Sequence, residues 1–480
     1  MRLDELAAAA DPVRTRGAVD VEIGSLAYDC RRVEPGAAFF CVPGERADGH
    51  DFAGTAVEAG AVALVVEREL ELPVPQVVVA DVRAAMAPIA ARFFGDPTAE
   101  LKVIGVTGTN GKTTTAFLIR EILESAGIRC GLLGTVMRVV GGVEEEVERT
   151  TPEAIDLQGT FRQMLDSGDR SCSMEVSSHA LALHRSDAIR FEVALFTNLT
   201  QDHLDFHGSM EDYFQSKRRL FEAGPQTAIV NVDDPHGRRL AADFDCVTFS
   251  AEGADADLSA RGVSFDAGGA TFTVSGDVEV RTRLPGDFNV ANALGALAAA
   301  TALEIDAEAA ARGLATAEAP PGRFEPIDEG QPFSVLVDYA HTPDSLENVL
   351  RAARRLTEGS VIAVFGAGGD RDRDKRPKMG RAGAEGADLA IVTSDNPRSE
   401  EPDAIIADIL AGIDGEGRVQ VEPDRRAAIA LAFSHAGPGD TVVIAGKGHE
   451  QGQEFEGGRK IPFDDREVAR QELRRLEAAA

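Results

Sequence analysis

Apolar residues recur in short runs along the first hundred positions of the chain. The runs AAFFCVP, AVALVVE and PQVVVA are separated by polar segments that contain glycine, a pattern typical of buried strands joined by turns. They are followed by FFGDPTAELK, residues 93–102, which combines glycine, proline and charged residues. We therefore expect a first domain over residues 1–99 that ends in a linker.

The middle of the chain begins with a predicted strand and a predicted helix on either side of a glycine-rich loop. KVIGV indicates the strand, and the apolar spacing and closing glycine of TTTAFLIREILESAG indicate the helix. Further strands are predicted at SCSMEVS, VALFTNL and TAIVNVD, antiparallel hairpins between residues 258 and 284, and a helix at NVANALGALAAATAL. The proline-bearing segment AEAPPGRFEPI is expected to be a hinge. These elements predict a second domain over residues 100–319, of the P-loop ATPase-like type with a mixed sheet.

Strands and helices alternate regularly from about residue 320. The strand candidates are FSVLVDYA, SVIAVFGAGG, DLAIVTSDN, RVQVEP and TVVIAGKG. They predict a doubly wound, Rossmann-like domain over residues 320–480, and with it a three-domain α/β protein. Functional residues of such sheets gather at the carboxyl ends of the strands, where DYAH, GAGGDRD, SDNPR and GKGHE lie. GAGGDRD lacks the spacing G-x-G-x-x-G, which disfavours a dinucleotide site.

Length and composition narrow the class of protein. A chain of 480 residues with 44% hydrophobic residues fits two or three folded domains. The sequence has no run of about 18 apolar residues and no secretory signal pattern, so we expect a cytoplasmic protein without a membrane partner. Five scattered cysteines without CxxC spacing fit a reducing compartment. A net charge of −31 argues against a nucleic-acid partner, because the phosphate backbone would be repelled.

The loop in VIGVTGTNGKTTT, residues 103–115, is similar to a phosphate-binding loop but differs in spacing. The general pattern places a glycine six positions before the lysine, where this chain has Val106. The order of strand, glycine-rich turn, Lys-Thr and helix still allows backbone N–H groups and a helix N-terminus to face phosphate oxygens. Lys112 would neutralise the β- and γ-phosphates, and Thr113 would offer its hydroxyl to Mg²⁺. The alternative is a glycine turn beside an incidental Lys-Thr pair.

A second group of candidate residues lies in residues 174–221. Glu175 ends one predicted strand and His203 follows another. A carboxylate and an imidazole at neighbouring strand ends can form a hard-cation site, and the alternative is that each is a structural hydrogen-bonding residue. Lys217 lies on a predicted helix, where the alternative is a lysine whose ammonium extends to solvent. Lys217 and Lys447 are among only seven lysines in 49 basic residues, which suggests that these positions need a compact primary amine.

Motifs in one order along nearly the whole chain resemble those of the Mur ligases. They are GVTGTNGKTT, MEVSSHAL, TNLTQDHLDFHGSMEDYFQSKRRLF, DYAHTPDSL, GGDRDRDKRPKMG, SDNPR and AGKGHE. The family writes its phosphate loop as GTNGKT, so the unusual spacing matches the family's own. The resemblance implies three domains, which bind UDP-MurNAc, ATP and an amino acid in that order. It also implies that ATP phosphorylates a carboxylate, and that the amine of the amino acid then attacks the acyl phosphate.

The resemblance further implies which residues surround ATP and magnesium. Thr113 and Glu175 would bind Mg²⁺, and His203 would bind a second ion. Lys217 would carry a carbamate that becomes a further oxygen ligand of Mg²⁺, which arginine could not do in the same way. The implied catalytic set comprises Lys112, Glu175, His203 and Lys217. The implied ATP contacts are Gly108, Thr109, Asn110, Gly111, Lys112, Thr113, Thr114, Asn292, Arg323, Asp338 and His341.

A third set of residues is implied for the substrate UDP-MurNAc-L-Ala-D-Glu. It comprises Cys30, Thr150, Thr151, Ser177 and Arg185. Three positions depart from the family pattern: Cys30 stands where serine is common, Arg149 where asparagine can occur, and Leu183 where glutamine can occur. These departures weaken the transfer of roles for the uracil and dipeptide contacts and leave the phosphate chemistry untouched. The alternative for Cys30 is a small buried side chain.

The block SDNPR bears on the choice of amino acid. In the diaminopimelate-adding branch of the family this block supplies an arginine, here Arg398, that can bind the distal carboxylate of meso-2,6-diaminopimelate in a bidentate manner. Glu450 would face the distal ammonium. The implied pocket comprises Arg371, Asp395, Asn396, Pro397, Arg398, Gly446 and Glu450. The alternative is an Asn-Pro turn beside a surface arginine.

Three rival functions remain open at the level of sequence. A folylpolyglutamate synthase shares the loop and the acyl-phosphate chemistry, but SSHAL and DNPR favour cell-wall substrates. A lysine-adding ligase is nearer still, and DNPR is the main argument against it. A P-loop ATPase switch or motor would hydrolyse ATP without ligation. If the chain is a Mur ligase of this branch, it acts in peptidoglycan precursor synthesis. We also expect a monomer.

Overall fold

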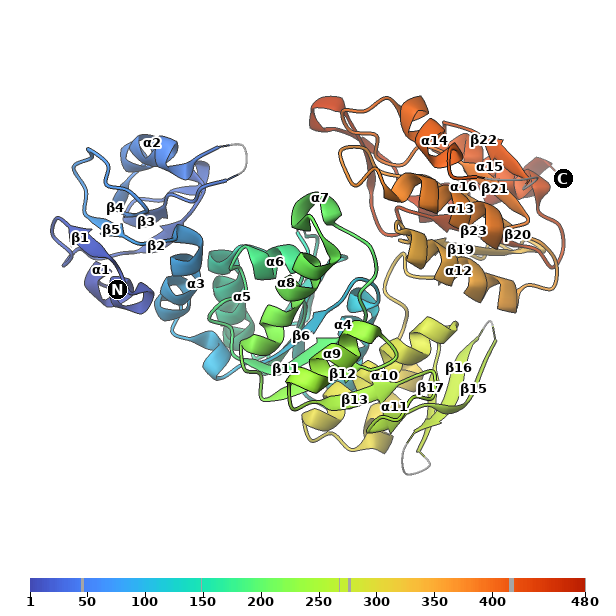
Figure 1. The fold of residues 1–480 in the computed structure, drawn as a ribbon, viewed down its shortest axis with the longest axis horizontal. Helices are drawn as coiled ribbons and strands as arrows, with labels where there is room; N and C mark the ends of the chain where they lie inside the picture. The colour runs from blue at the N-terminus through green and yellow to red at the C-terminus, as the bar shows by residue number, and fades with distance from the viewer. Residues whose placement is uncertain (45–46, 148, 267, 275–277, 414–417, 480) are drawn as a thin grey trace. The chain divides into compact units, whose positions relative to one another are not determined.

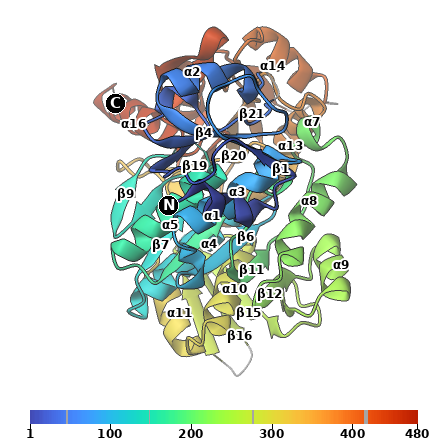
Figure 2. The same cartoon turned by 90° about the vertical axis from the view of Figure 1, so that its left-hand side faces the viewer.

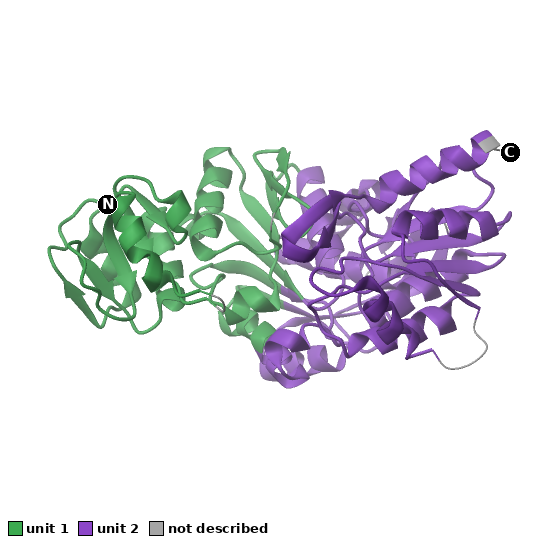
Figure 3. Ribbon diagram, turned by 90° about the horizontal axis from the view of Figure 1, so that it is seen from above, with its two compact units in different colours: residues 1–107, 127–194, 216–228 green, residues 108–126, 195–215, 229–480 purple. Residues whose placement is uncertain are grey.

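The computed structural model describes most of the chain (Figure 1). The chain divides into two compact units. The described residues are 1–44, 47–147, 149–266, 268–274, 278–413 and 418–479. Unit 1 contains residues 1–107, 127–194 and 216–228, and unit 2 contains residues 108–126, 195–215 and 229–480 (Figure 3). Among the described helices, none combines the length and the apolar character needed to cross a bilayer.

The first sheet belongs to unit 1 and has the strand order β1-β5-β4-β3-β2, with β1 antiparallel at one edge and the other strands parallel. Its elements are α1 (Leu3–Ala7), β1 (Arg14–Arg16), β2 (Ser25–Ala27), β3 (Ala37–Phe40), α2 (Ala53–Glu58), β4 (Ala61–Val66), β5 (Gln76–Val78) and α3 (Val82–Phe93). Figure 2 shows this part of the chain in blue. Because alternate side chains of a strand face opposite sides, Ala38 and Phe40 join one buried cluster and Phe39 joins another. Apolar residues thus cover both faces, which explains the uninterrupted run AAFF.

A nine-stranded sheet follows, in the order β14-β13-β12-β11-β6-β10-β7-β8-β9. Its strands are β6 (Lys102–Thr107), β7 (Cys130–Leu133), β8 (Arg138–Val140), β9 (Val143–Glu145), β10 (Ser171–Glu175), β11 (Phe191–Phe196), β12 (Thr227–Asn231), β13 (Val247–Ser250) and β14 (Leu258–Ser259). β10 pairs in parallel with β6 and β7, whereas β7, β8 and β9 pair antiparallel. The predicted mixed sheet and the four predicted strands are therefore confirmed. Val106, which occupies the glycine position of the general loop pattern, is a fully buried residue of β6.

Eight helices connect or follow these strands in the described residues. They are α4 (Lys112–Ser125), α5 (Ala154–Asp166), α6 (Ser178–Ala182), α7 (Leu204–His207), α8 (Met210–Glu222), α9 (Pro235–Asp243), α10 (Asp287–Ala302) and α11 (Ala307–Thr316). The helices predicted after the loop and at NVANALGALAAATAL are confirmed as α4 and α10. The helix predicted around Lys217 is α8.

The predicted hairpins form a separate antiparallel sheet of β15 (Arg261–Asp266), β16 (Gly269–Val274) and β17 (Val278–Thr282). The first residues of the predicted region differ from the prediction, because β14 pairs in parallel with β13 at the edge of the nine-stranded sheet. The connections at residue 267 and residues 275–277 lie outside the described residues.

The last sheet has the order β18-β19-β23-β20-β21-β22, parallel except for β18 at one edge. Its strands are β18 (Glu325–Pro326), β19 (Ser334–Asp338), β20 (Val361–Phe365), β21 (Leu389–Val392), β22 (Val419–Val421) and β23 (Thr441–Ala445). The accompanying elements are α12 (Pro343–Leu356), α13 (Lys375–Gly386), α14 (Pro402–Leu410), α15 (Arg425–His435), the hairpin β24 (Gly452–Phe455) and β25 (Arg459–Pro462), and α16 (Asp465–Ala479). The predicted proline-bearing hinge runs between α11 and β19 and contains only the two-residue strand β18.

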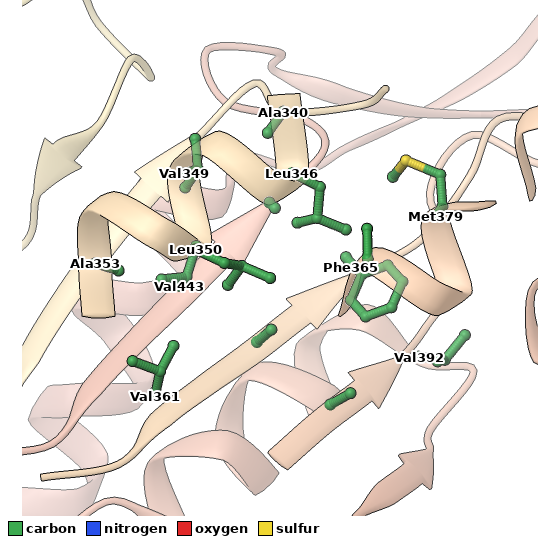
Figure 4. Close-up of a cluster of buried hydrophobic side chains, with 14 of the residues drawn as sticks. Ala340, Leu346, Val349, Leu350, Ala353, Val361, Phe365, Met379, Val392 and Val443 are labelled. Carbon is green, nitrogen blue, oxygen red and sulfur yellow. The ribbon is translucent and has the colours of Figure 1, made fainter. Parts of the chain in front are cut away.

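Helices cover both faces of this last sheet. Val361 and Phe365 of β20 pack in a cluster with Leu346 of α12 and Met379 of α13 (Figure 4), whereas Ile362 packs with residues of α15 and α16 on the opposite face. The doubly wound prediction is therefore confirmed. The parallel register aligns the ends of the central strands, so the motifs DYAH, GAGGDRD, SDNPR and GKGHE all leave the sheet at its carboxyl edge.

Candidate active site

The phosphate loop, residues 108–114, leads from β6 into the first turn of α4. Gly108 and Gly111 have φ angles of +150° and +85°, which L-residues rarely adopt. A Cβ built at Gly108 would overlap the hydroxyl of Thr197, and one at Gly111 would overlap the amide oxygen of Asn292. The glycines are therefore needed both for backbone conformation and for close approach.

Lys112 and Thr113, at the start of α4, form hydrogen bonds with other residues of unit 2. The ammonium of Lys112 donates to the carbonyls of Gly108 at 3.0 Å and Thr109 at 2.7 Å. The buried hydroxyl of Thr113 accepts a hydrogen bond of 3.0 Å from the Arg323 guanidinium. Lys112 thus lies over its own loop, where a bound anion would compete with neutral carbonyls for the ammonium.

Residues that follow β11 hold the phosphate loop in place. The Thr109 N–H donates to the Asn198 carbonyl at 2.8 Å, and the Asn110 N–H donates to the Asn198 side chain at 2.9 Å. Thr200 donates its N–H to the Thr109 hydroxyl at 3.0 Å. The Asn110 amide donates in turn to Asp344 at 2.7 Å. Sequence reasoning missed Asn198, Thr200 and Asp344, although all three lie in motifs that it had singled out.

Four further predicted ATP residues also belong to unit 2. Asn292 on α10 accepts a hydrogen bond of 3.3 Å from the Thr115 hydroxyl and contacts the loop at Gly111. The Arg323 guanidinium lies 4.5 Å above the Tyr339 ring. Burial raises the pKa of Asp338, and the nearby Arg323 opposes that shift. His341 follows three residues later and directs Nδ1 to the Tyr339 carbonyl at 2.8 Å.

Asp202 connects the two predicted site histidines. Its carboxylate lies 3.3 Å from His203 Nε2, 3.7 Å from His341 Nε2 and 3.9 Å from Lys375 Nζ. Burial alone would raise the pKa of Asp202, but the nearby His341, His203 and Lys375 hold it well below its usual range. His203 has a left-handed backbone with φ of +55°, and its N–H donates to Asp202 at 2.9 Å. This carboxylate therefore orients both imidazoles.

In unit 1 the structure brings Glu175 together with Thr135. The Thr135 N–H donates to Glu175 Oε1 at 2.7 Å, and the Thr135 hydroxyl donates to Oε2 at 3.0 Å. The hydroxyls of Thr135 and Thr150 lie 3.0 Å apart. Thr151 donates its hydroxyl to the Glu175 carbonyl at 2.9 Å and accepts the Ser177 N–H at 3.1 Å. Four of the predicted residues thus form one hydrogen-bonded group.

Arg185 joins this group through Thr151 and Glu153. Its guanidinium donates to the Thr151 carbonyl at 3.3 Å and lies 2.9 Å from the Glu153 carboxylate. Glu153 is 6% exposed and also pairs with Arg149 at 3.1 Å and with Arg83 at 3.5 Å. Burial lowers the pKa of Arg185, and Glu153 opposes the shift. Arg149, which departs from the family pattern, therefore has a structural partner in this chain.

The structure does not join Cys30 to the Glu175 group through any contact among the described residues. Cys30 is half-buried in a short 3₁₀ turn over residues 30–32. Its side chain packs against the buried cluster that contains Phe39 and Leu64, so both its role in substrate binding and the alternative of a small buried side chain stay open.

Lys217 lies on α8 and is 1% exposed. The alternative in which its ammonium extends to solvent is therefore wrong. A lysine is almost never buried without a specific function or partner.

The predicted amino-acid pocket (Arg371, Asp395–Arg398, Gly446 and Glu450) gathers at the carboxyl edge of the last sheet. Arg398 has φ of +52°; its Nε donates to Glu454 at 3.0 Å and its Nη1 to the Gly369 carbonyl at 2.7 Å. The Arg371 guanidinium donates to the carbonyl of its neighbour Asp370 at 3.4 Å. The Arg398 guanidinium is thus held by two hydrogen bonds, and its side chain is 21% exposed.

Asn396 and Glu450 form the other part of this pocket. The Asn396 amide donates to Glu450 Oε2 at 2.9 Å. Asp395 is buried, which would raise its pKa, but the charges of Lys447 and Arg425 lower it. Gly446 has φ of +123°, and a Cβ there would lie 2.5 Å from an Asp395 oxygen. The close packing of this edge leaves no room for a side chain at Gly446.

The predicted magnesium ligands fit the ion by their chemistry. Carboxylate and hydroxyl oxygens are the donors that Mg²⁺ prefers, and both Glu175 and Thr113 offer them. Within the described part of the chain, no group of three or more His, Cys, Asp or Glu side chains forms a metal cluster.

Comparison with known sequences extends these observations. The Mur ligase middle domain matches residues 106–300, the Mur ligase glutamate ligase domain residues 322–448, and the catalytic domain of the Mur ligase family residues 22–94. Two proteins named UDP-N-acetylmuramoyl-L-alanyl-D-glutamate-2,6-diaminopimelate ligase are each 48% identical to this chain. The one from Streptomyces coelicolor covers 95% of this chain and 93% of its own length, and the one from Geobacillus thermodenitrificans covers 94% of each.

Solved structures give the same picture. A structure of a UDP-N-acetylmuramoyl-L-alanyl-D-glutamate-2,6-diaminopimelate ligase is 34% identical, has a TM-score of 0.70 and covers 99% of both chains. MurF from Acinetobacter baumannii is 22% identical, has a TM-score of 0.68 and covers 100% of this chain and 99% of its own. A folylpolyglutamate synthase from Mycobacterium tuberculosis is 18% identical, with a TM-score of 0.62 over 82% of this chain and 95% of its own. The last two share the fold.

Proposed function

Because this chain belongs to the Mur ligase family, we propose that it adds meso-2,6-diaminopimelate to UDP-N-acetylmuramoyl-L-alanyl-D-glutamate with conversion of ATP to ADP. The observation that carries this proposal is the 48% identity, over 95% of the chain, to a relative with that name. The SDNPR block and the oriented guanidinium of Arg398 support the choice of amino acid. The reaction belongs to peptidoglycan precursor synthesis, and we propose that the protein acts in the cytoplasm as a monomer.

The reaction proceeds in two steps. An oxygen of the D-glutamyl γ-carboxylate attacks the γ-phosphorus of ATP, so that an acyl phosphate forms and ADP leaves. The amine of the incoming amino acid then attacks the acyl carbon, its proton is released, and phosphate leaves as the amide forms. Positioning and charge neutralisation provide most of the catalysis, because phosphoryl transfer needs little covalent help from the protein.

The phosphate loop would bind the ATP phosphates through its N–H groups and the N-terminus of α4. Lys112 would turn from the carbonyls of its own loop to the γ-phosphate, where a full charge replaces neutral acceptors. Asn292, which lies beside Gly111, and Arg323, which donates to Thr113, would also contact the nucleotide. Asp338 and His341 would complete the contacts near Tyr339.

Thr113 and Glu175 would hold Mg²⁺, and His203 would hold a second ion. When bound, Mg²⁺ neutralises phosphate oxygens and makes the γ-phosphorus more electrophilic. Lys217 would carry a carbamate, formed when its neutral amine adds CO₂, and would thereby become an anionic ligand. The hydrogen bonds from Thr135 would orient Glu175 for this task.

We assign the three binding tasks to three domains. Residues 1–99 would bind the UDP-MurNAc part of the substrate, residues 100–319 would bind ATP, and residues 320–480 would bind the amino acid. Thr150, Thr151, Ser177 and Arg185 would contact the dipeptide, because they form one group with Glu175 in unit 1. Cys30 would contact the nucleotide part.

Diaminopimelate differs from lysine by a carboxylate at its distal end. Arg398 would bind that carboxylate, and Glu450 would bind the distal ammonium. Arg371, Asp395, Asn396, Pro397 and Gly446 would complete the pocket. A ligase that uses L-lysine is the second candidate. The SDNPR block argues against it, since lysine has no distal carboxylate for the Arg398 guanidinium to bind.

A single assay tests the proposal. The protein is incubated with ATP, Mg²⁺ and UDP-MurNAc-L-Ala-D-Glu, together with meso-diaminopimelate, L-lysine or L-ornithine, and both phosphate and the tripeptide product are measured. We expect phosphate release only when both substrates are present, and a kcat/KM at least about tenfold higher for diaminopimelate than for lysine.

Three outcomes would contradict parts of this proposal. Equal or better use of lysine would remove the selector role of Arg398. Phosphate release without either substrate would favour a P-loop ATPase switch. Turnover of a folate substrate in place of the muramoyl dipeptide would favour a folylpolyglutamate synthase.

A further inference from the structure

Lys447 is a fully buried lysine beside the amino-acid pocket. Its ammonium donates to Asn396 Oδ1 at 2.9 Å and to Glu450 Oε2 at 2.8 Å, and it lies 4.0 Å from Asp395 Oδ1. Its side chain is 0% exposed. Both hydrogen bonds have a charged donor, so they hold the buried ammonium in one position and also fix the positions of Asn396 and Glu450.

The Asn396 amide can take only one orientation beside this ammonium. Its oxygen accepts from Lys447 Nζ and from the Glu454 N–H, both at 2.9 Å. A flipped amide would direct its NH₂ group at two donors. The NH₂ group therefore points the other way, where it donates to Glu450 Oε2.

Lys447 also fixes one oxygen of Glu450. Lys447 and the Asn396 amide both donate to Glu450 Oε2. Among the hydrogen bonds of the described residues none involves Oε1, so this oxygen can accept from a ligand. The Glu450 side chain is 30% exposed, whereas its lysine partner is buried. The carboxylate is thus held from the protein side and open on the other.

The same network reaches Arg398 through Glu454. Glu454 donates its N–H to Asn396 Oδ1, accepts the Arg398 N–H on its carbonyl at 3.0 Å and accepts Arg398 Nε on its carboxylate. The two ends of the pocket, one anionic and one cationic, therefore share a common anchor at Asn396.

We propose that Lys447 is a positioning residue that sets the specificity of the amino-acid pocket: it orients Asn396 and Glu450 without touching the substrate. It also offsets the negative charges of Glu450 and Asp395. With Lys447 present, the pocket can accept a substrate that carries a distal carboxylate. Without Lys447, the carboxylates of Glu450 and Asp395 would repel that group and favour a purely cationic side chain such as that of lysine. This inference rests on the proposed function.

The test is Lys447→Met, which removes the charge and keeps an unbranched apolar chain. Lys102→Met is the control, because Lys102 is an exposed residue of β6, outside the last sheet. We expect the KM for diaminopimelate to rise about tenfold or more, with kcat and the KM values for ATP and UDP-MurNAc-L-Ala-D-Glu within about twofold of the wild type. The preference for diaminopimelate over lysine should fall by a similar factor. The control should match the wild type.

A double-mutant cycle separates positioning from a general structural effect. If Lys447 acts through Glu450, then Lys447→Met in a Glu450→Gln background should change the KM for diaminopimelate by less than about twofold. Lys447→Gln keeps a donor without the charge and should give an intermediate KM, which provides a second variant if Lys447→Met does not fold.

The outcomes for Lys447 and for the proposed function are distinguishable. A wild-type enzyme that does not ligate diaminopimelate contradicts the proposed function whatever the variants do. An active wild type whose KM and amino-acid preference are unchanged by both Lys447 variants overturns the positioning role. Equal rises in the KM values of all three substrates would also overturn it, because they indicate a general loss of structure.

Discussion

Gly111 is the position at which a single methyl group tests the phosphate loop most directly. Its φ is +85°, and a Cβ built there meets the amide oxygen of Asn292. An L-residue with a left-handed backbone costs roughly 1–2 kcal/mol, and overpacking a tight site costs about 1–3 kcal/mol more. Gly111→Ala should therefore destabilise the protein by about 2–5 kcal/mol, or shift the loop and its phosphate-binding N–H groups.

Gly127 provides a matched control directly after the same helix. Its φ is +80°, and among the described residues nothing lies within 4 Å of a Cβ built there. Gly127→Ala thus carries the backbone cost of roughly 1–2 kcal/mol without the steric contact. Both variants are compared by urea unfolding and by the KM for ATP in the ligation assay. We expect an unchanged KM for Gly127→Ala and a rise of at least about tenfold for Gly111→Ala, equivalent to about 1.4 kcal/mol.

The comparison has a clear refuting result. If both variants lose the same stability and both keep the wild-type KM for ATP, then the contact between Gly111 and Asn292 has no role in nucleotide binding. The loop would then need another explanation for its glycine at this position. A KM that rises equally in both variants would point instead to the end of α4 as a whole.

Three other predictions concern single charged groups. Lys217→Ala should lose most ligase activity and regain part of it when a small carboxylic acid is added. Lys102→Ala, at an exposed position, should keep full activity. An undiminished rate for Lys217→Ala would contradict the proposed carbamate. Asp344→Asn replaces a carboxylate acceptor of the phosphate loop and should raise the KM for ATP several-fold, about 1 kcal/mol, with kcat for saturating ATP nearly unchanged. The Arg376 guanidinium lowers the pKa of Glu400 from 4.5 to about 2, with help from the Asp370 N–H and Arg373. The ionised Glu400 should therefore stabilise the fold above pH 4.5, and this contribution should be lost as the pH falls toward 2. Unfolding of Glu400→Gln and the wild type should differ at pH 7 and converge at low pH, and a pH-independent difference would contradict the assignment.

The elements that were predicted correctly depend on local patterns. The strand β6, the loop and α4 follow from apolar spacing and glycine within about twenty residues of sequence. The two faces of β20 follow from alternation along a single strand. β14 was assigned to a hairpin because its sequence alternates like its neighbours, and only its pairing with β13 decides otherwise.

Sequence reasoning missed Asp344 and Glu153 because an acidic residue at each of these positions has an ordinary local explanation. Asp344 is an acidic residue in the first turn of α12, which the helix dipole alone would justify. Its hydrogen bond to Asn110 joins residues 234 positions apart. Glu153 similarly precedes a helix, yet it is buried among three arginines. No periodicity within one segment reports such contacts.

The sequence by itself determined the order of the motifs along the chain, the strand, loop and helix around Lys112, and the residue types that the proposed acyl-phosphate chemistry requires. The tertiary structure alone decided that Lys217 and Lys447 are buried, that Asp202 orients two histidines, and which way the Asn396 amide points. The physical reason is the range of each effect. Backbone conformation and apolar periodicity arise within one segment, whereas the burial and hydrogen-bond partners of a polar side chain depend on segments far away in the chain.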